Sequence, residues 1–472
     1  MTADIRLSFF GKDPRSTVLS RGGRILRTGI DVALSRAVLA DEGVRRLMEE
    51  GSLVTTRLVE DEAGGPLLEH RPMTPFTYPG EWSFSMLRDA ALATLHVRET
   101  LSRAGFELKD AHSYNVTFDG CVPVFIDFAS IGEADPRYAS WRAGEEYLDA
   151  FVRILRIWSR TNRRAALSFL NAVWARPDDE ALVFSGPAAH RLRSRLMQAY
   201  GKAVIATAMS REARREALAN LGLGGLKRRA AGLLLGGMDA GYRLVGHPYS
   251  MSRLRRATLE IARPVNATMW ASYQQDLSLH RALTPRFGRI IDITAGLGAR
   301  DAFEVAGNQG ALSEALVERG AVSSVICSDY DEHAVDALFL RMRAKGHSGI
   351  TPLVHDVMMP DPIRTQGARK LQGDVVIALA LTHHLLLTQR YRLDAVLERI
   401  VAHGRRHMII EFMPKGLWDG SSGPPVPSWY TQSWFAAGLE RYGRIRLCEK
   451  LEENRVAYLV EIGGGSARGE GQ

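Results

Sequence analysis

The sequence has few cysteines, no long apolar run and no start resembling a signal peptide. Its three cysteines, Cys121, Cys327 and Cys448, lack the paired spacings of zinc sites and disulfide frameworks. We therefore expect no bound metal and a reducing compartment. No stretch approaches the roughly 18 apolar residues of a membrane span, and the first residues lack the apolar core of a signal peptide. These absences predict a cytoplasmic protein that does not cross a membrane.

The charge is moderately basic, at +8 for pH 7 with a sequence pI near 9.5. This balance permits nucleic-acid binding without requiring it. Much of the arginine lies in helical stretches such as 191–195 and 211–215, where a solvent-exposed face is the commoner explanation. The 472 residues exceed one ordinary domain, and 46% hydrophobic with 24% charged residues is typical of globular chains.

Residues 302–331 contain the pattern around which the C-terminal half is organised. It predicts a strand, a glycine turn, an amphipathic helix and a second strand closed by an acid: Ala302–Ala306, Gly307 to Gly310, Ala311–Arg319, and Ser324–Cys327 followed by Asp329. A strand, a glycine turn and a helix leading to a second strand with a terminal acid form one βαβ nucleotide-binding unit.

The spacing of these residues predicts a chemistry. Glycines at 307 and 310 let a ligand approach the backbone, and the amides at the helix start offer hydrogen-bond donors and a positive dipole end. Asp329 is placed to accept both hydroxyls of a ribose. Glu304, which precedes the turn, suits a cationic or ammonium-bearing ligand better than a pyrophosphate.

The rest of the C-terminal half continues the alternation of strands and helices. The predicted elements are a strand ending in an acid, a buried strand, a helix, a further strand and an antiparallel pair: Leu353–Asp356, Asp374–Leu381, Leu393–Val401, Met408–Phe412, and Ile445–Leu451 with Val456–Glu461. This order predicts a Rossmann-like α/β domain with a seven-stranded sheet.

A second candidate for the first strand and turn lies at Ile290–Gly298, where an apolar run meets Gly296-x-Gly298. Asp329 lies 37 residues beyond Asp292 but 25 beyond Glu304. The usual separation in related nucleotide folds is about 20. We therefore rank the turn at 304–310 first and keep 292–298 as the alternative.

The motif Glu304-x-x-Gly307-x-x-Gly310 with Asp329 resembles motifs I and II of class I S-adenosylmethionine (SAM) dependent methyltransferases. The resemblance implies SAM as cofactor, and Asp356 would lie where this family contacts the adenine amine. The predicted cofactor-binding residues are Glu304, Gly307, Asn308, Gly310, Asp329, Tyr330, Asp356 and Ala380.

His383 and His384 follow the fourth predicted strand, where many methyltransferases place a catalytic polar residue. A neutral imidazole can act as a general base. We predict His384, with His383 as the alternative, because only one of two adjacent residues at a strand end faces the ligand. The absence of Asn/Asp-Pro-Pro-Tyr/Phe after this strand disfavours amino-methylation of bases. Glu411, Lys415 and Trp418 are candidates for shaping the acceptor pocket.

A second constellation lies in the N-terminal half. Asp110, Asn115 and Asp127, with a predicted hairpin before Asp127, resemble the catalytic loop and metal motif of aminoglycoside-phosphotransferase-type kinases. Leu108-Lys109 replaces the expected His-Gly, and no glycine-rich phosphate loop is evident upstream. A degenerate kinase-like fold without activity is therefore favoured over phosphotransfer. The surrounding segments predict a mixed α+β, largely helical domain.

The chain as a whole resembles the nodulation-protein NoeA-like family of class I SAM methyltransferases. The resemblance rests on seven blocks: Tyr78–Phe84, Leu108–Phe128, Trp270–Tyr273, Glu304–Gly310, Asp329–Asp331, Ala378–Leu385 and Ile410–Lys415. It implies methyl transfer but specifies no acceptor.

We predict four regions: an N-terminal domain, a linker with lid helices including Trp270 and Tyr273, a methyltransferase domain and a flexible tail, at 1–235, 236–280, 281–462 and 463–472. The predicted function is methyl transfer from SAM to a small-molecule or carbohydrate-type acceptor, on oxygen or nitrogen. An RNA methyltransferase and an ATP-dependent phosphotransferase using Asp110, Asn115 and Asp127 remain as alternatives.

Overall fold

The chain forms two compact units in the computed structural model. The N-terminal unit comprises residues 1–80 and 84–265, and the C-terminal unit comprises 81–83 and 266–472. The structure describes residues 5–6, 16–60, 65–171, 179–180, 183, 187–221, 224–264, 284–347, 349–359, 371–418 and 420–463. Trp270 and Tyr273, predicted to form a lid, and the predicted tail beyond 463 lie outside the described residues.

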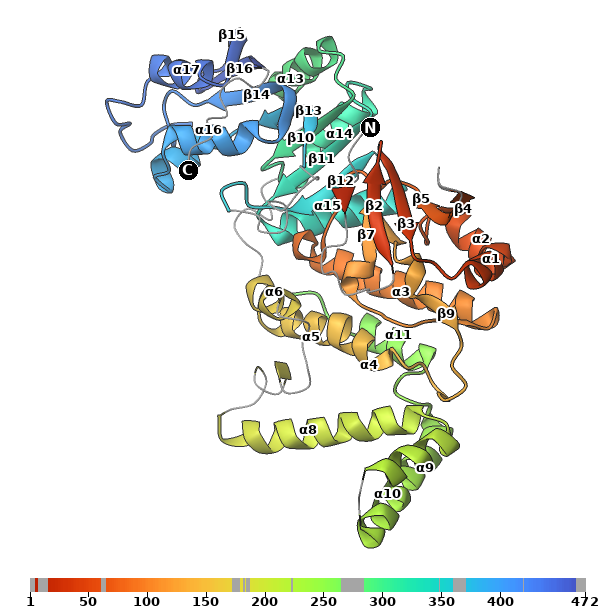
Figure 1. Ribbon diagram of the computed structural model, residues 1–472. Helices are drawn as coiled ribbons and strands as arrows, with labels where there is room; N and C mark the ends of the chain where they lie inside the picture. Colours follow the sequence, from red (N-terminus) through yellow and green to blue (C-terminus); the bar gives the residue numbers. More distant parts are fainter. Residues whose placement is uncertain are drawn as a thin grey trace, which may run out of the picture. The chain divides into compact units, whose positions relative to one another are not determined.

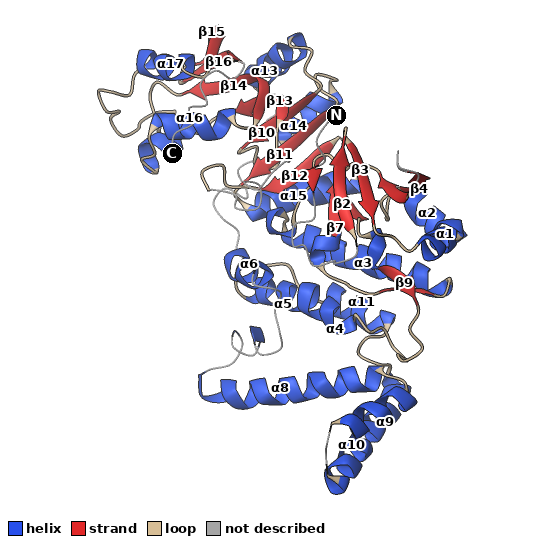
Figure 2. Ribbon diagram, viewed as in Figure 1, coloured by secondary structure: helices blue, strands red, loops and turns tan. Residues whose placement is uncertain are grey.

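The C-terminal unit contains a seven-stranded sheet with helices on both faces (Figures 1 and 2). Its strands are β10 (Asp301–Val305), β11 (Ser324–Asp329), β12 (Ile350–Val354), β13 (Gly373–Ala378), β14 (Gly404–Phe412), β15 (Gly443–Glu452) and β16 (Arg455–Ile462). Its helices are α13 (Pro285–Gly296), α14 (Ala311–Glu318), α15 (Glu332–Ala344), the π-helical turn η6 (His384–Thr388), α16 (Leu393–Val401) and α17 (Gln432–Glu440).

The strand order is β12-β11-β10-β13-β14-β16-β15. The first five strands are parallel, whereas β16 runs antiparallel to both β14 and β15. This order, with its antiparallel strand inserted beside the fifth, is that of class I SAM-dependent methyltransferases, and it confirms the predicted fold class.

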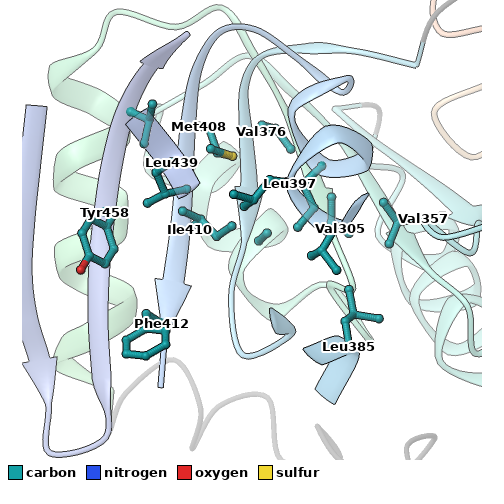
Figure 3. Close-up of a cluster of buried hydrophobic side chains, with 14 of the residues drawn as sticks. Val305, Val357, Val376, Leu385, Leu397, Met408, Ile410, Phe412, Leu439 and Tyr458 are labelled. Atoms are coloured by element: carbon teal, nitrogen blue, oxygen red, sulfur yellow. The ribbon is translucent and has the colours of Figure 1, made fainter. Parts of the chain in front are cut away.

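Alternating residues of the central strands fill two hydrophobic cores. Phe303, Val305 and Val376 face a core that also contains Leu397 of α16 and Leu439 of α17, and Figure 3 shows part of this cluster. The intervening residues, Ala302, Val375 and Ile377, contribute to a second core with apolar residues of α13 and α14. The period of two follows from the pleat, and burial on both faces explains why these strands are almost entirely apolar.

The alternative first motif at 290–298 is wrong. Residues Pro285–Gly296 form helix α13, so Asp292 lies in a helix and no strand leads into Gly296. Phe287, Ile290, Ile291 and Thr294 are buried at helical spacing. A short apolar run cannot distinguish a strand from a helix by itself, and here the i, i+3, i+4, i+7 pattern beginning at Phe287 decides.

The N-terminal unit combines a small antiparallel sheet with many helices. Its strands are β1 (Ile5–Arg6), β2 (Thr17–Arg21), β3 (Arg24–Thr28), β4 (Thr56–Glu60), β5 (Pro66–His70), β6 (Phe106–Leu108), β7 (Val116–Asp119), β8 (Val122–Phe125) and β9 (Ile131–Glu133). Five strands form one sheet in the order β1-β2-β3-β5-β4, and the others form the pairs β6-β9 and β7-β8.

The helices of this unit are α1 (Val32–Ala40), α2 (Glu42–Glu49), η1 (Pro79–Glu81), α3 (Phe84–Arg103), η2 (Ser113–Asn115), η3 (Phe128–Ser130), α4 (Gly144–Tyr147), η4 (Leu148–Val152), α5 (Arg153–Arg160), α6 (Arg163–Asn171), α8 (Pro187–Ala208), α9 (Arg211–Asn220), α10 (Gly225–Val245) and α11 (Met251–Leu259). Gly236 and Gly237 lie inside α10, so these glycines do not begin a linker. None of the described helices is long and apolar enough to cross a membrane.

Candidate cofactor site

The predicted site residues lie where the strand order of the C-terminal sheet reverses. Strand β10 has β11 on one side and β13 on the other, and the chain leaves it in one direction and returns in the other. In open α/β sheets this switch point, outside the carboxyl ends of the strands, is where ligands bind. Non-glycine residues with positive φ follow β10 and β13 there: Ala306 (55°), Asn308 (52°) and Ala380 (52°).

The turn after β10 needs glycines for two reasons. Neighbouring side chains leave no room for a Cβ, and a ligand must be able to approach the backbone. A Cβ on Gly307 would come within 2.6 Å of Cys327 Sγ and 2.8 Å of Glu304 Cδ. Gly310 has φ +73°, and its Cβ would lie 2.8 Å from Leu338 Cδ1. Any side chain at these positions would push the turn off the sheet.

Asp329, at the end of β11, binds the turn from the neighbouring strand. Its Oδ2 accepts the backbone N–H of Asn308 at 2.8 Å, and its Oδ1 accepts that of Asp331 at 2.9 Å. The side chain is buried, and burial raises its pKa to about 6. Within the described residues it forms no ion pair. A carboxylate has about four lone-pair sites, so each oxygen keeps capacity for a further donor.

Glu304 is directed beneath the turn. Its Oε2 accepts the backbone N–H of Ser313 at 3.1 Å and also the Ser313 hydroxyl, and Cys327 Sγ lies 3.8 Å away. Burial raises the pKa of Glu304 to about 7. The carboxylate thus ties the end of β10 to the first turn of α14. Ser313 was not predicted as part of the site, because a serine inside a predicted helix has no distinctive local signal.

Two further predicted residues continue from Asp329 along the sheet edge. Tyr330 is 56% exposed, and burial of its remaining surface raises its pKa. Asp356 is exposed after β12, and its Oδ1 accepts the backbone N–H of Met358 at 3.0 Å. The structure therefore places these side chains on the same edge as Asp329, with Asp331 capping α15 beneath them.

Ala380, on the other side of the switch point, is held by a buried ion-pair network. Glu411, at the end of β14, accepts the backbone N–H of Ala380 at 2.9 Å and pairs with Arg455 at 3.0 Å and Arg286 at 3.3 Å. Glu411 has no exposed surface. Its carbonyl oxygen also accepts the Thr382 hydroxyl at 2.8 Å. Glu411 therefore fixes the shape of the loop after β13 from behind, and the two arginines were not predicted.

His383 and His384 begin the segment after Ala380, and η6 starts at His384. Their ring centroids lie 4.1 Å apart. Burial lowers the pKa of His383 to about 3 and also lowers the pKa of His384. His383 is buried, and its Nδ1 has no hydrogen-bond partner in the described structure, whereas His384 is half-buried. Both imidazoles are therefore neutral near pH 7. The helix that begins at His384 is π-helical, and such turns are frequent at functional sites.

Lys415 and Trp418 lie in the loop after β14. Lys415 Nζ is 4.2 Å from the centre of the Trp418 ring, and the ammonium also pairs with Glu453. The Lys415 backbone N–H donates to Asn454 Oδ1 at 2.6 Å. The two side chains therefore contact each other, as their spacing allows.

The site is rich in acceptors and contains uncompensated acids. Glu304 and Asp329 are buried without an ion pair within the described residues, and they accept hydrogen bonds from backbone N–H groups. No group of three His, Cys, Asp or Glu side chains suited to a metal ion occurs in the described part of the chain. These features fit a ligand with hydroxyl groups and positive charge, and SAM carries both a ribose and a cationic sulfonium.

No protein-family model matches this chain. The chain is 27% identical to nodulation protein NoeA of Rhizobium meliloti (strain 1021) over 421 residues, which cover 86% of this chain and 84% of that protein. This similarity confirms the predicted resemblance to NoeA over most of the sequence.

Solved structures similar to this chain include magnesium protoporphyrin IX methyltransferase ChlM of Synechocystis PCC 6803 with bound SAM, at 14% identity and a TM-score of 0.30, covering 42% of this chain and 86% of that one. Another is the N-methyltransferase NodS of Bradyrhizobium japonicum WM9, at 12% identity and a TM-score of 0.29, covering 40% and 99%. The strand order, rather than these low scores, identifies the fold of the C-terminal unit.

Proposed function

We propose that the C-terminal unit binds SAM and transfers its methyl group to a small-molecule or carbohydrate-type acceptor. The observation that carries the proposal is the state of Asp329. It ends the strand beside the switch point, holds the glycine turn through Asn308, and keeps free acceptor capacity with no ion pair within the described residues.

We assign the parts of the cofactor by matching their chemistry to these groups. Asp329 would accept the ribose hydroxyls, and Tyr330 and Asp356 would lie on the adenine side. The turn containing Gly307, Asn308 and Gly310 would approach the methionine portion through its backbone, with the Glu304 charge beneath it. Ala380 would border the methyl group from the opposite side of the switch point.

Bound SAM would supply a methyl group on a positively charged sulfur. The protein must align the acceptor with that carbon, exclude water, and take up the proton of an alcohol or protonated amine. His384, with His383 as the alternative, is the proposed base. Because both imidazoles are neutral near pH 7, either can accept a proton without first losing one.

The experiment is a transfer assay with tritiated SAM against pools of small hydroxylated and amino compounds, oligosaccharides and total RNA. We expect label in a small-molecule or carbohydrate pool, and a roughly 100-fold lower kcat in the His384→Asn variant because general-base catalysis contributes that much. His383→Asn is the matched control and should change kcat far less. Equal loss in both variants would contradict the assignment of the base, and no labelled pool would contradict the acceptor class.

The formal charge of +8 favours RNA as a second candidate acceptor. RNA binding through phosphates weakens steeply with salt, because counterions are released on binding. Label in the RNA pool, with retention on RNA that falls as salt rises from 50 to 200 mM, would replace the small-molecule proposal by this one.

A further inference from the structure

The order of elements in the N-terminal unit can be compared with that of kinases. Its sheet has the order β1-β2-β3-β5-β4, the helices α1 and α2 lie between β3 and β4, and α3 precedes the loop that carries Asp110 and Asn115. The hairpin β7–β8 then leads to Asp127. In kinases a lysine on the third strand pairs with a helix glutamate, and an asparagine and an aspartate hold the magnesium ions.

The structure brings two of the predicted metal ligands to one place. The backbone carbonyl of Asn115 accepts the N–H of Ile126 at 2.8 Å, so Asn115 lies beside the residue that precedes Asp127. Asn115 is 5% exposed. Asn115 precedes β7 and Asp127 follows β8, so both lie at the open end of the hairpin. A metal site here would need this arrangement.

A cation from the protein already occupies Asp127. Arg27, on β3, places Nη2 2.8 Å from Asp127 Oδ1, and its Nη1 donates to Ser16 Oγ at 3.0 Å. The side chains of Arg27 and Asp127 are only 12% and 25% exposed. Arg27 therefore pairs with Asp127 rather than with a helix glutamate. Asp127 is the acid on which a kinase would place its metal.

A magnesium ion does not fit beside this pair. Magnesium binds carboxylate oxygen at about 2.0–2.1 Å and demands an octahedral shell. An ion on Asp127 would then face a guanidinium at close range, and arginine cannot lose its proton to relieve the repulsion. The carboxylate that the kinase-like motif assigns to the metal is thus paired from within the chain.

We infer that Arg27 takes the place of the metal ion on Asp127, so that the N-terminal unit keeps a kinase-like fold without metal-dependent phosphoryl transfer. The inference is independent of the methyl transfer proposed for the C-terminal unit. It also assigns Arg27 a role in holding β3 to the segment after β8, across 100 residues of sequence.

The test measures manganese binding to the full-length protein, with and without ATP. Electron paramagnetic resonance reports the concentration of free Mn²⁺. Wild type should leave the signal of Mn²⁺ and Mn-ATP unchanged. Arg27→Met, which keeps an apolar stem but removes the charge, should bind one Mn²⁺ per chain at Asp127. Adding Asp127→Asn to that variant should abolish the binding.

Arg57→Met is the matched control, since Arg57 pairs with Glu69 on an exposed part of the same sheet. It should leave Mn²⁺ binding unchanged. Circular dichroism and thermal unfolding confirm that each variant is folded, and Arg27→Gln replaces Arg27→Met if the latter is not. Mn-ATP binding by wild type that Asp127→Asn removes would overturn the inference, as would a folded Arg27 variant that binds no Mn²⁺.

Discussion

Two acids in the two units follow strands in similar ways and have opposite surroundings. Asp127, after β8, is paired with Arg27 at 2.8 Å, whereas Asp329, at the end of β11, is bound by two backbone amides and forms no ion pair within the described residues. The pair at Asp127 is complete without a ligand. The charge at Asp329 is buried and uncompensated, which raises its pKa to about 6 and leaves it available to a ligand with hydroxyl groups and positive charge.

Glu411 shows that the same contrast holds within one sheet. It ends β14 as Asp329 ends β11, but Arg286 and Arg455 compensate its charge. An acid at a strand end is therefore not sufficient to indicate a ligand site. The cations around that acid decide whether it supports the fold or remains available for binding.

The largest expected effect follows from removing the compensated acid. Glu411→Ala removes the buried partner of Arg286 and Arg455, which then keep only the partly exposed Glu452, and we expect the free energy of unfolding of the C-terminal unit to fall by about 3 kcal/mol. Urea unfolding followed by tryptophan fluorescence measures this loss.

Glu449→Ala is the control for that change. Glu449 pairs with Arg289, also on α13, but both side chains are at least one-third exposed. Exposed pairs contribute at most about 1 kcal/mol, so the unfolding curve should hardly move. Similar losses in the two variants would show that compensation by buried arginines does not distinguish Glu411.

A smaller effect is expected from pH. Burial raises the pKa of Glu304 to about 7 and that of Asp329 to about 6, so the folded chain holds these protons more tightly than the unfolded chain. Stability from this source is complete below pH 4 and is lost as pH rises through 6 to 7. Thermal unfolding of wild type and of the Glu304→Gln/Asp329→Asn variant is compared from pH 4.5 to 8. The stability of wild type relative to the variant should fall as pH rises. A constant difference would contradict the raised pKa values.

The smallest expected effect is on cofactor affinity. If ribose hydroxyls donate to ionised Asp329, SAM should bind about tenfold more weakly at pH 5 than at pH 7, since the acid must first lose its proton. Calorimetric titration at the two pH values measures the change. Asp329→Asn should bind weakly with no such dependence, and a pH-independent affinity in wild type would show that Asp329 does not meet the cofactor as an anion.

Local pattern was enough to predict the βαβ core. The strand, turn and helix from Asp301 to Glu318 follow from a short, mostly apolar run, two glycines and a period of 3.6, and each of these signals lies within about ten residues. Ile290–Gly298 was ambiguous because three isoleucines among four residues suit a strand or a helix. Gly236 and Gly237 suggested a linker, but helix α10 continues through them despite a cost of about 1 kcal/mol per glycine.

The cations could not be predicted in the same way. Arg27 lies 100 residues from Asp127, and Arg286 lies 125 residues from Glu411. No periodic signal links residues so far apart. From the sequence alone, each of these arginines resembles an ordinary surface charge. The sequence therefore indicated which acids stand at strand ends, and only the fold distinguished the compensated acids from Asp329.

The most direct test of this account is calorimetric titration of SAM into wild type and Asp329→Ala at pH 7.5. We predict micromolar binding to wild type and at least a 100-fold loss in the variant, because a carboxylate bound to two hydroxyls contributes about 3 kcal/mol. Asp127→Ala should bind SAM as wild type does. No binding to folded wild type, or equal binding to Asp329→Ala, would contradict the assignment of the uncompensated acid to the cofactor.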